Sequence, residues 1–506
     1  MRPNIIFITA DQQRGDCYGF AGRPIKTPHL DQLRAEGAWL RNTITPCVIC
    51  QPARASILTG QLPLTHGVHD NGIDLDPAIG NKGIGGALGA AGYDTAFFGK
   101  AHFATTHTFR PTGTPECLVS SENYGPDWYG PYMGFSHVEI MLLGHNWFLP
   151  EKPPRGQHYE RWYHADGRGD EKNRLYRENA VDTHGAAQTW HSKLPVAWHN
   201  STWTADRAIA WMRRSRAQPF MTWISFPDPH HPFDCPEPWS RLHHPDEVDL
   251  PPHRTRDFDK RPWWHRGVIE NEPAGNKQNA EMRKVYSRIG PQSDRQLREI
   301  IANTFGQIAL IDHNVGRLLI ALDELGLRDN TLVVYSSDHG DWLGDHGLIL
   351  KGPMHYEGLL RVGMIARGPG IPAGKTVLDP ASTLDLSATF LDYAGASALL
   401  TQHGQSLKPI FETTSASRDF AYNEWELHQN RAGVALSLKT VRTRDAKLTV
   451  DLKSGEGELY DLAEDPHELT NRFSDPAKAN LKARLMDMIR SRPDDAGPLS
   501  EPIGMA

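Results

Sequence analysis

Residues Asn4–Ala10 read NIIFITA, and this short apolar run is the first of several that decide the fold class. Three more runs follow, at residues 94–98 (DTAFF), 220–226 (FMTWISF) and 331–336 (TLVVYS). They are rich in β-branched and aromatic residues, and they lack the polar alternation of a strand with one face in water. Such runs are typical of strands buried on both faces of a parallel sheet.

Helical patterns lie between these runs. Residues 27–37 begin with a Thr-Pro pair that suits a helix N-terminus and end at a glycine, and residues 297–326 are long and strongly periodic. The alternation predicts an α/β sandwich, with a large and mostly parallel central sheet flanked by helices. Two stretches do not show this alternation of strands and helices, at about residues 104–200 and 235–290. We interpret these Pro-, Trp-, His- and Tyr-rich stretches as ordered insertions, which are either functional or packed surface decoration.

A second, smaller unit follows the helix predicted at residues 381–396. The patterns GVALSLKTV, AKLTVDL and LYDL predict a small antiparallel sheet, and a last helix at about residues 477–490 would pack on it. We therefore place a catalytic α/β domain at residues 1–396 and a C-terminal α+β subdomain with a tail at residues 397–506. The tail is interpreted as an arm for a homo-oligomer or as disordered chain.

Composition narrows the range of partners. The chain has 506 residues, a formal net charge of −7 and no polybasic run, which argues against nucleic acid and anionic membrane surfaces. No apolar stretch approaches the length of a membrane span, and the first residues lack a signal-peptide pattern, so we expect a cytoplasmic protein. The five cysteines are an odd number in a long chain, which does not indicate a disulfide framework.

Polar side chains follow each of the four predicted strands. In open α/β sheets, ligands bind beyond the carboxyl ends of the strands, so these side chains are expected at one rim. Each alone is an ordinary turn or surface residue, and their combination predicts an active site. In chain order they are Asp11 and Gln12, Lys100 and His102, His230 and His231, and Asp338 and His339.

The stretch CQPARASILTG, residues 50–60, predicts a short helix with Pro52 at its first position and Gly60 after its end. A cysteine at a helix N-terminus should have a lowered pKa, and Arg54 can reach back toward it. Cys50 is therefore either an activated nucleophile near an anion site or an inert buried thiol. A redox pair or half a zinc site with Cys47 would need a thioredoxin-like context or a second ligand pair, and the sequence has neither.

The pattern C-x-P-x-R followed by L-T-G resembles the signature of type I, formylglycine-dependent sulfatases of the alkaline phosphatase superfamily. The variant here is similar to the subgroup that holds arylsulfatases and phosphonate monoester hydrolases. Other family patterns follow in order along nearly the whole chain. They are G-K-x-H at residues 99–102, P-H-x-P at 229–232, S-D-H-G at 337–340, Lys351 before Y-E-G, and L-Y-D-L-x-x-D-P-x-E-x-x-N at 459–471.

This resemblance implies a sulfuric ester hydrolase that cleaves aryl or alkyl sulfate monoesters of a small molecule. It implies that a formylglycine-generating enzyme converts Cys50 to formylglycine (3-oxoalanine), whose hydrate attacks sulfur. The implied catalytic residues are Cys50, Arg54, Lys100, His102, His230 and Lys351. The implied ligands of one divalent metal ion are Asp11, Gln12, modified Cys50, Asp338 and His339.

The same resemblance implies a role for each position. Arg54 would hold the hydrated aldehyde, and Lys100 and Lys351 would bind the sulfate oxygens. His230 would protonate the leaving alcohol, and His102 would take a proton in the release step. Tyr124, Trp128, Tyr129 and Trp147 are candidates either for the leaving-group pocket or for core packing.

Two departures from the usual family pattern affect the metal and the substrate. Gln12 replaces a second acid, and His339 is an imidazole where many sulfatases carry an amide. The family implies Ca²⁺, while the imidazole makes Mn²⁺ or Mg²⁺ the alternative. Lys100 and His102 favour a sulfate ester, and the alternative is a phosphonate monoester hydrolase or phosphodiesterase on the same scaffold.

Overall fold

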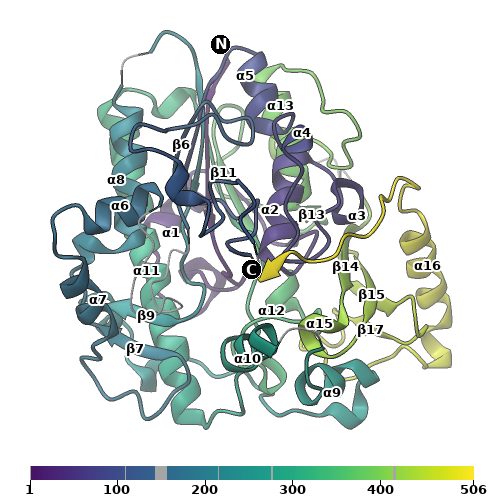
Figure 1. Cartoon of the computed structure of the whole chain (residues 1–506). Helices are drawn as coiled ribbons and strands as arrows, with labels where there is room; N and C mark the ends of the chain where they lie inside the picture. Colours follow the sequence, from purple (N-terminus) through teal and green to yellow (C-terminus); the bar gives the residue numbers. More distant parts are fainter. Residues whose placement is uncertain are drawn as a thin grey trace.

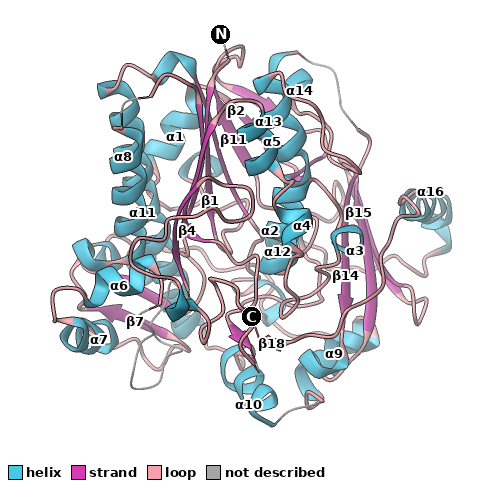
Figure 2. Ribbon diagram, turned by 45° about the horizontal axis from the view of Figure 1, so that its top comes forward, coloured by secondary structure: helices cyan, strands magenta, loops and turns pink. Residues whose placement is uncertain are grey.

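The computed structural model describes residues 2–108, 110–142, 156–214, 216–274, 277–413 and 418–505. Across these residues, an eight-stranded central sheet has the order β12-β2-β11-β10-β1-β8-β4-β6 (Figures 1 and 2). Only β11 runs antiparallel to its neighbours, and the other adjacent pairs are parallel. The mostly parallel sheet expected from the sequence is thus confirmed. In sheet order the strands are β12 (Lys375–Val377), β2 (Ala38–Leu40), β11 (Met364–Arg367), β10 (Thr331–Ser337), β1 (Asn4–Ala10), β8 (Phe220–Ser225), β4 (Asp94–Lys100) and β6 (His137–Met141).

Helices cover both faces of this sheet, which explains its apolar strands. Along β1, Ile6 and Ile8 pack on one face, and Ile5 and Phe7 pack on the other. Figure 1 shows one helical layer on each side of the sheet. The first layer contains α1 (Pro28–Ala35), α8 (Asn200–Met212) and α11 (Asp294–Glu324), and the second contains α2 (Cys50–Thr59), α5 (Ile84–Ala90) and α13 (Leu386–Ala394).

The register of the central strands places their following residues side by side. β1 and β10 pair in parallel from Asn4 with Thr331 to Ala10 with Ser337. Asp11 and Asp338 therefore leave the sheet at the same level, on neighbouring strands. This register is the structural basis of the site described below.

The four strands predicted from apolar runs correspond to β1, β4, β8 and β10, but β6 was missed. This edge strand lies inside the stretch interpreted as an insertion at residues 104–200, so that interpretation holds only in part. Its sequence, HVEIM, carries polar residues because it has a neighbour on one side only. Glu139 of β6 pairs with Arg207 of α8, an ion pair that no local pattern reveals.

The C-terminal part forms a four-stranded antiparallel sheet with one helix against it. The sheet joins the catalytic part through β14, where the Glu424 N–H donates to the Pro46 carbonyl oxygen at 3.0 Å. Leu485 and Ile489 of α16 pack on the sheet together with Leu448. The boundary at residue 396 stays a prediction. The elements are β14 (Ala421–Leu427), β15 (Leu436–Arg442), β16 (Ala446–Asp451), β17 (Gly457–Asp461) and α16 (Ala479–Arg490).

The tail after α16 returns to the catalytic part as an ordered strap. In Figure 1 this yellow segment runs from α16 back to the middle of the molecule. Its Gly497 N–H donates to Leu64 O at 2.7 Å, and β18 (Gly504–Met505) pairs with β5 (His107–Thr108). The expectation of disordered chain is therefore wrong, because backbone hydrogen bonds hold the tail to its own chain. A homo-oligomer stays a prediction.

No helix within the described ranges combines the length and the apolar character needed to cross a membrane.

Candidate active site

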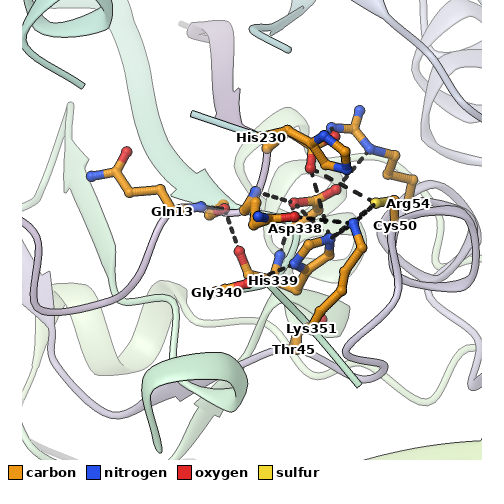
Figure 3. Close-up of polar contacts among 12 residues, drawn as sticks. Gln13, Thr45, Cys50, Arg54, His230, Asp338, His339, Gly340 and Lys351 are labelled. Atoms are coloured by element: carbon orange, nitrogen blue, oxygen red, sulfur yellow. Dashed lines mark hydrogen bonds and ion pairs between the residues drawn. The ribbon is translucent and has the colours of Figure 1, made fainter. Parts of the chain in front are cut away.

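Cys50 is the first residue of α2 and lies at the centre of a buried polar cluster (Figure 3). The helix ends at Gly60, whose φ of 67° is a left-handed conformation that glycine adopts without strain. It begins two residues earlier than expected, so Pro52 lies inside the first turn rather than at its first position. Proline is tolerated there because the first-turn N–H groups have no partner within the helix.

Positive groups surround the Cys50 sulfur. The Lys351 ammonium donates to Sγ at 2.9 Å, and His339 Nε2 lies 3.0 Å from it. Burial by itself would raise the pKa of the thiol, but Lys351, His339 and Lys100 together hold that pKa well below its usual value. The thiol is thus an acidic one, as expected, and the neighbouring charges account for it.

Two carboxylates from adjacent strands complete the cluster. Asp11 follows β1 and Asp338 follows β10, and both side chains are fully buried. Their oxygens, the Cys50 sulfur and a His339 ring nitrogen all lie within 4.8 Å of one another. Burial raises the pKa of Asp11 and the Cys50 charge adds to this, but Lys100, with other positive groups, outweighs both and lowers it below its usual range.

Arg54 bridges the two carboxylates instead of reaching back to Cys50. Its Nε donates to Asp338 at 2.9 Å, and its Nη2 donates to Asp11 at 3.2 Å. Its Nη1 donates to Lys100 O at 2.7 Å and to the Ser225 hydroxyl at 2.8 Å. The expectation of direct contact with Cys50 is therefore not met, because the buried acids are the stronger partners for a guanidinium.

His339 is oriented as a ligand would be. Its Nδ1 lies 2.8 Å from Gly340 O, and because a carbonyl oxygen only accepts, Nδ1 carries the proton. In the neutral ring, Nε2 keeps its lone pair, and it faces Cys50 and Asp11 at 3.0 Å and 3.7 Å. A backbone partner that sets the tautomer in this way is typical of metal-ligating histidines.

Gln12 presents its amide oxygen to the same cluster. The Gln12 Nε2 group donates to Asp341 at 2.6 Å, and Gln12 Oε1 accepts from Lys351 Nζ at 3.2 Å. Asp341 itself accepts from the N–H groups of Leu343 and Leu350. Asp341 was not among the predicted site residues, although it lies three residues after Asp338. By accepting from Gln12, it fixes the direction in which the Gln12 amide points.

These donors fit a cation. The Lys351 ammonium already lies within 3.2 Å of Gln12 Oε1, Cys50 Sγ and His339 Nε2. The two carboxylates add the negative charge that a divalent ion requires. All five predicted ligand positions are thus brought together.

Lys100, His102 and His230 also lie at this rim. Lys100 Nζ is 2.6 Å from Asp11. Burial, together with the charges of Lys351 and Lys100, lowers the pKa of His230 to about 3. Both ring nitrogens of His102 are buried, and the ring interacts with the Cys50 side chain. Burial also lowers the pKa of His102, so this ring is neutral and can accept a proton.

Glu116 holds the turn that carries His102, a contact that was not predicted from the sequence. Its buried carboxyl accepts from the N–H groups of His102, Phe103 and Ala104, and from the Tyr132 hydroxyl at 2.7 Å. Burial raises its pKa to about 7, although these donors favour the carboxylate. No local pattern reveals this contact, because Glu116 and His102 are fourteen residues apart in the chain that follows β4.

Replacing Glu116 by alanine is expected to lower kcat by about a hundredfold, because small displacements of a reacting group cost rates of this order. Glu122→Ala, an exposed acid on the following 3-10 turn, is the matched control and should leave kcat unchanged. Steady-state kinetics on an aryl sulfate measures both. An unchanged kcat for Glu116→Ala would mean that His102 needs no such support.

A pocket opens over the cluster, with walls different from those predicted. Of the four aromatic candidates, Trp147 lies outside the described residues, and Tyr124, Trp128 and Tyr129 do not line the pocket. Tyr124 instead packs on Trp128, and Tyr129 stacks on His137. The aromatic residues that line the pocket are Tyr286 at the end of α10 (Lys277–Tyr286), Trp342 in the loop after β10, and Trp425 within β14.

Sequence and structure comparisons agree with this geometry. The sulfatase family model matches residues 3–396, and the model of the C-terminal part of N-sulphoglucosamine sulphohydrolase matches residues 344–494. The fold and site define a hydrolase of the alkaline phosphatase superfamily. The chain belongs to the sulfatase family, and it is a sulfuric ester hydrolase.

Among its relatives is an arylsulfatase of Clostridium perfringens, 28% identical, with 93% of this chain and 90% of the relative covered. A multifunctional alkaline phosphatase superfamily protein of Trinickia caryophylli is also 28% identical, with coverage of 95% and 93%. The phosphonate monoester hydrolase of Agrobacterium radiobacter has a similar structure, with a TM-score of 0.73, 25% identity, and coverage of 97% and 96%.

Proposed function

We propose that this protein hydrolyses aryl or alkyl sulfate monoesters with a formylglycine nucleophile made from Cys50. The observation that carries the proposal is the position of Cys50 Sγ, 2.9 Å from Lys351 Nζ and 3.0 Å from His339, at the floor of the pocket. A thiol there would be trapped as a stable adduct after attack on sulfur. A hydrated aldehyde offers one hydroxyl for attack and a second that lets the sulfate leave.

The chain's own residues supply charge and protons around that position. Lys351 and Lys100 provide positive charge for the sulfate oxygens. His230 would protonate the leaving alcohol, and the sulfate's negative charge would raise the pKa of His230 from the low value set by burial and the two lysines. His102, which is neutral and interacts with the Cys50 side chain, would accept the proton in the release step.

A divalent metal ion would be held by Asp11, Gln12, Asp338, His339 and modified Cys50, and would supply Lewis-acid stabilisation of the sulfuryl oxygens. We propose Ca²⁺, as the family resemblance implies, with Mn²⁺ or Mg²⁺ as the alternative because one ligand is an imidazole. Metal analysis after chelation and reconstitution distinguishes them. A protein that regains full activity with no divalent ion would contradict the assignment.

The proposal requires maturation by a formylglycine-generating enzyme. The tryptic peptide of residues 42–54 contains both Cys47 and Cys50, and its mass reports conversion of a thiol to an aldehyde. Fragmentation of this peptide should place the change at Cys50 and leave Cys47 intact. An unmodified Cys50 in fully active protein would refute the nucleophile assignment.

The second candidate is phosphonate monoester or phosphodiester hydrolysis. It is favoured by the similarity to the Agrobacterium radiobacter enzyme and by the Asp338-His339 pair. Lys100 and His102 favour sulfate. The test is a comparison of kcat/KM for an aryl sulfate and an aryl phosphonate monoester with the same leaving group, on one preparation with verified formylglycine. We expect the sulfate to be preferred, and a preference for the phosphonate would reverse the assignment.

A further inference from the structure

The charged side chains that line the pocket over Cys50 are all of one sign. The chain carries a net charge of −7, yet no Asp or Glu side chain is among the described residues that line this pocket. Its charged lining residues are all basic. They are Lys100, Arg256, Arg288, Lys351 and Arg431.

Three of these five basic groups already have partners or a role. Lys100 and Lys351 belong to the cluster around Cys50, and one sulfate monoester needs no more charge than they supply there. Arg431 is neutralised by Asp70, at 2.9 Å. Arg256 and Arg288 are left, and neither forms an ion pair with a carboxylate in the part of the chain that the structure describes.

Backbone carbonyl groups hold both arginines in place. Arg256 donates from Nε to Gly347 O at 3.1 Å and from Nη2 to Ile289 O at 2.8 Å. Arg288 donates from Nη2 to Asn271 O at 2.6 Å. Within the described ranges, the Nη1 group of each guanidinium has no acceptor. Each side chain is thus anchored on one side and keeps N–H donors for another partner.

Holding these charges in place has a cost that the fold offsets only in part, through the charge of Glu272 near Arg288. Both side chains are half-buried, and burial lowers the pKa of Arg256 and of Arg288. The backbone carbonyl groups accept from only some of the N–H donors of each guanidinium. A partly desolvated charge is stabilised most by an opposite charge. An anionic group of a bound ligand would provide it.

The rest of the wall suits an apolar body between two anionic ends. Trp342 and Trp425 line the pocket together with Val268 and Ile269. Aromatic faces of this kind pack against a ring or a hydrocarbon skeleton. The pocket therefore joins a sulfate site, an apolar wall and a second pair of cations.

We propose that the leaving group of the natural substrate carries a second anionic group, a carboxylate or a further sulfate, which Arg256 and Arg288 bind. This inference rests on the proposed function, because it takes the sulfate that is cleaved to lie at Cys50. It makes the two arginines specificity-determining residues, and it makes neutral or cationic sulfate esters poor substrates.

The test uses two substrates that differ in one charge, 4-(carboxymethyl)phenyl sulfate and its primary amide, 4-(carbamoylmethyl)phenyl sulfate. They have the same size and leaving phenols of closely similar acidity. The wild-type enzyme, with verified formylglycine and at low ionic strength, should prefer the carboxylate by about tenfold or more in kcat/KM, the size expected for charge-assisted hydrogen bonds. Because the amide shares the sulfate and the ring, the ratio isolates the second anion.

The double variant Arg256→Gln, Arg288→Gln should bring this ratio to within about twofold of one, because both charges are lost. Measurable turnover of the amide shows that the variant still folds. The variant Arg256→Lys, Arg288→Lys keeps the charge and should keep part of the preference. Arg213→Gln, an exposed arginine of the same charge paired with Glu324, is the matched control and should leave the ratio as in the wild type.

The outcomes separate the two proposals. If the wild type hydrolyses neither aryl sulfate, the proposed function fails. If it hydrolyses both with equal kcat/KM, or if the double glutamine variant keeps the wild-type ratio, sulfate hydrolysis stands and the second anionic group is overturned.

Discussion

Cys50→Ala is expected to lower kcat/KM for sulfate ester hydrolysis by at least about 10⁴-fold, the scale seen when a covalent nucleophile is removed. The alanine cannot be converted to an aldehyde, so no hydroxyl nucleophile can form at the start of α2. The side chain removed is small, and its sulfur contacts polar groups rather than apolar core. The fold should therefore persist, which circular dichroism and thermal unfolding can verify.

Cys47→Ala is the matched control, because the same atom is removed three residues earlier. Cys47 is buried in an apolar cluster with Val48 and Trp264, and burial raises the pKa of its thiol. Its loss should lower the free energy of unfolding by about 1 kcal/mol, the scale of a small core truncation. The value of kcat should be unchanged. Equal loss of activity in both variants would instead favour a Cys47–Cys50 pair that acts together.

Arg54→Met is expected to reduce the free energy of unfolding of the metal-free protein by about 3–5 kcal/mol, and to abolish activity. The substitution leaves Asp11 and Asp338 with no guanidinium between them, and both of these side chains are fully buried. Because the pKa of Asp11 lies below its usual value, its stabilising contribution is complete above a pH of about 4 and is lost as the pH falls further. Urea unfolding of chelated protein at pH 7 measures the effect where both acids are ionised.

Two further variants decide whether uncompensated charge is the cause. Arg213→Met removes an exposed arginine with an acidic partner, and should change stability by less than about 1 kcal/mol. Adding Asp338→Asn to Arg54→Met removes one of the stranded charges and should restore part of the stability, a coupling that a double-mutant cycle quantifies. If Arg54→Met were as stable as the exposed control, the contacts of Arg54 with the two carboxylates would make no contribution to stability.

The central sheet could be predicted because its strands are apolar on both faces. The run NIIFITA needs two helical layers to bury it, and the structure provides them on both sides of β1. The short strands β2, β11 and β12 and the edge strand β6 escaped prediction. Three or four residues leave no periodicity, and an edge strand carries polar residues that pair with neighbours distant in sequence.

The strand-end residues could be placed together for a related reason. Parallel strands end at one edge, so the residues after β1 and β10 must meet once the strands are neighbours. Their supporting residues could not be inferred in this way. Glu116 acts on His102 through backbone N–H groups, and Asp341 acts on Gln12 across a separation of 329 residues.

Of the two alternatives left open for the aromatic candidates, packing holds for the three that the structure describes. Tyr124, Trp128 and Tyr129 have the composition of a binding surface but pack on one another and on neighbouring histidines. The aromatic walls come instead from α10, from the loop after β10 and from β14, which converge from distant parts of the chain. Which segment covers a site depends on how whole elements cross, and residue type alone does not carry that information.

The position of Cys50 at a helix start, the family and the strand-end donors could all be predicted from the sequence, because each depends on a local pattern or on the direction of a parallel strand. The fold in three dimensions was needed to see that Arg54 binds the two carboxylates, that the tail is a strap, and that Arg256 and Arg288 line the pocket. Those features are contacts between residues far apart in the chain. Their energies depend on burial and on the nearest opposite charge, and both exist only after the chain has folded.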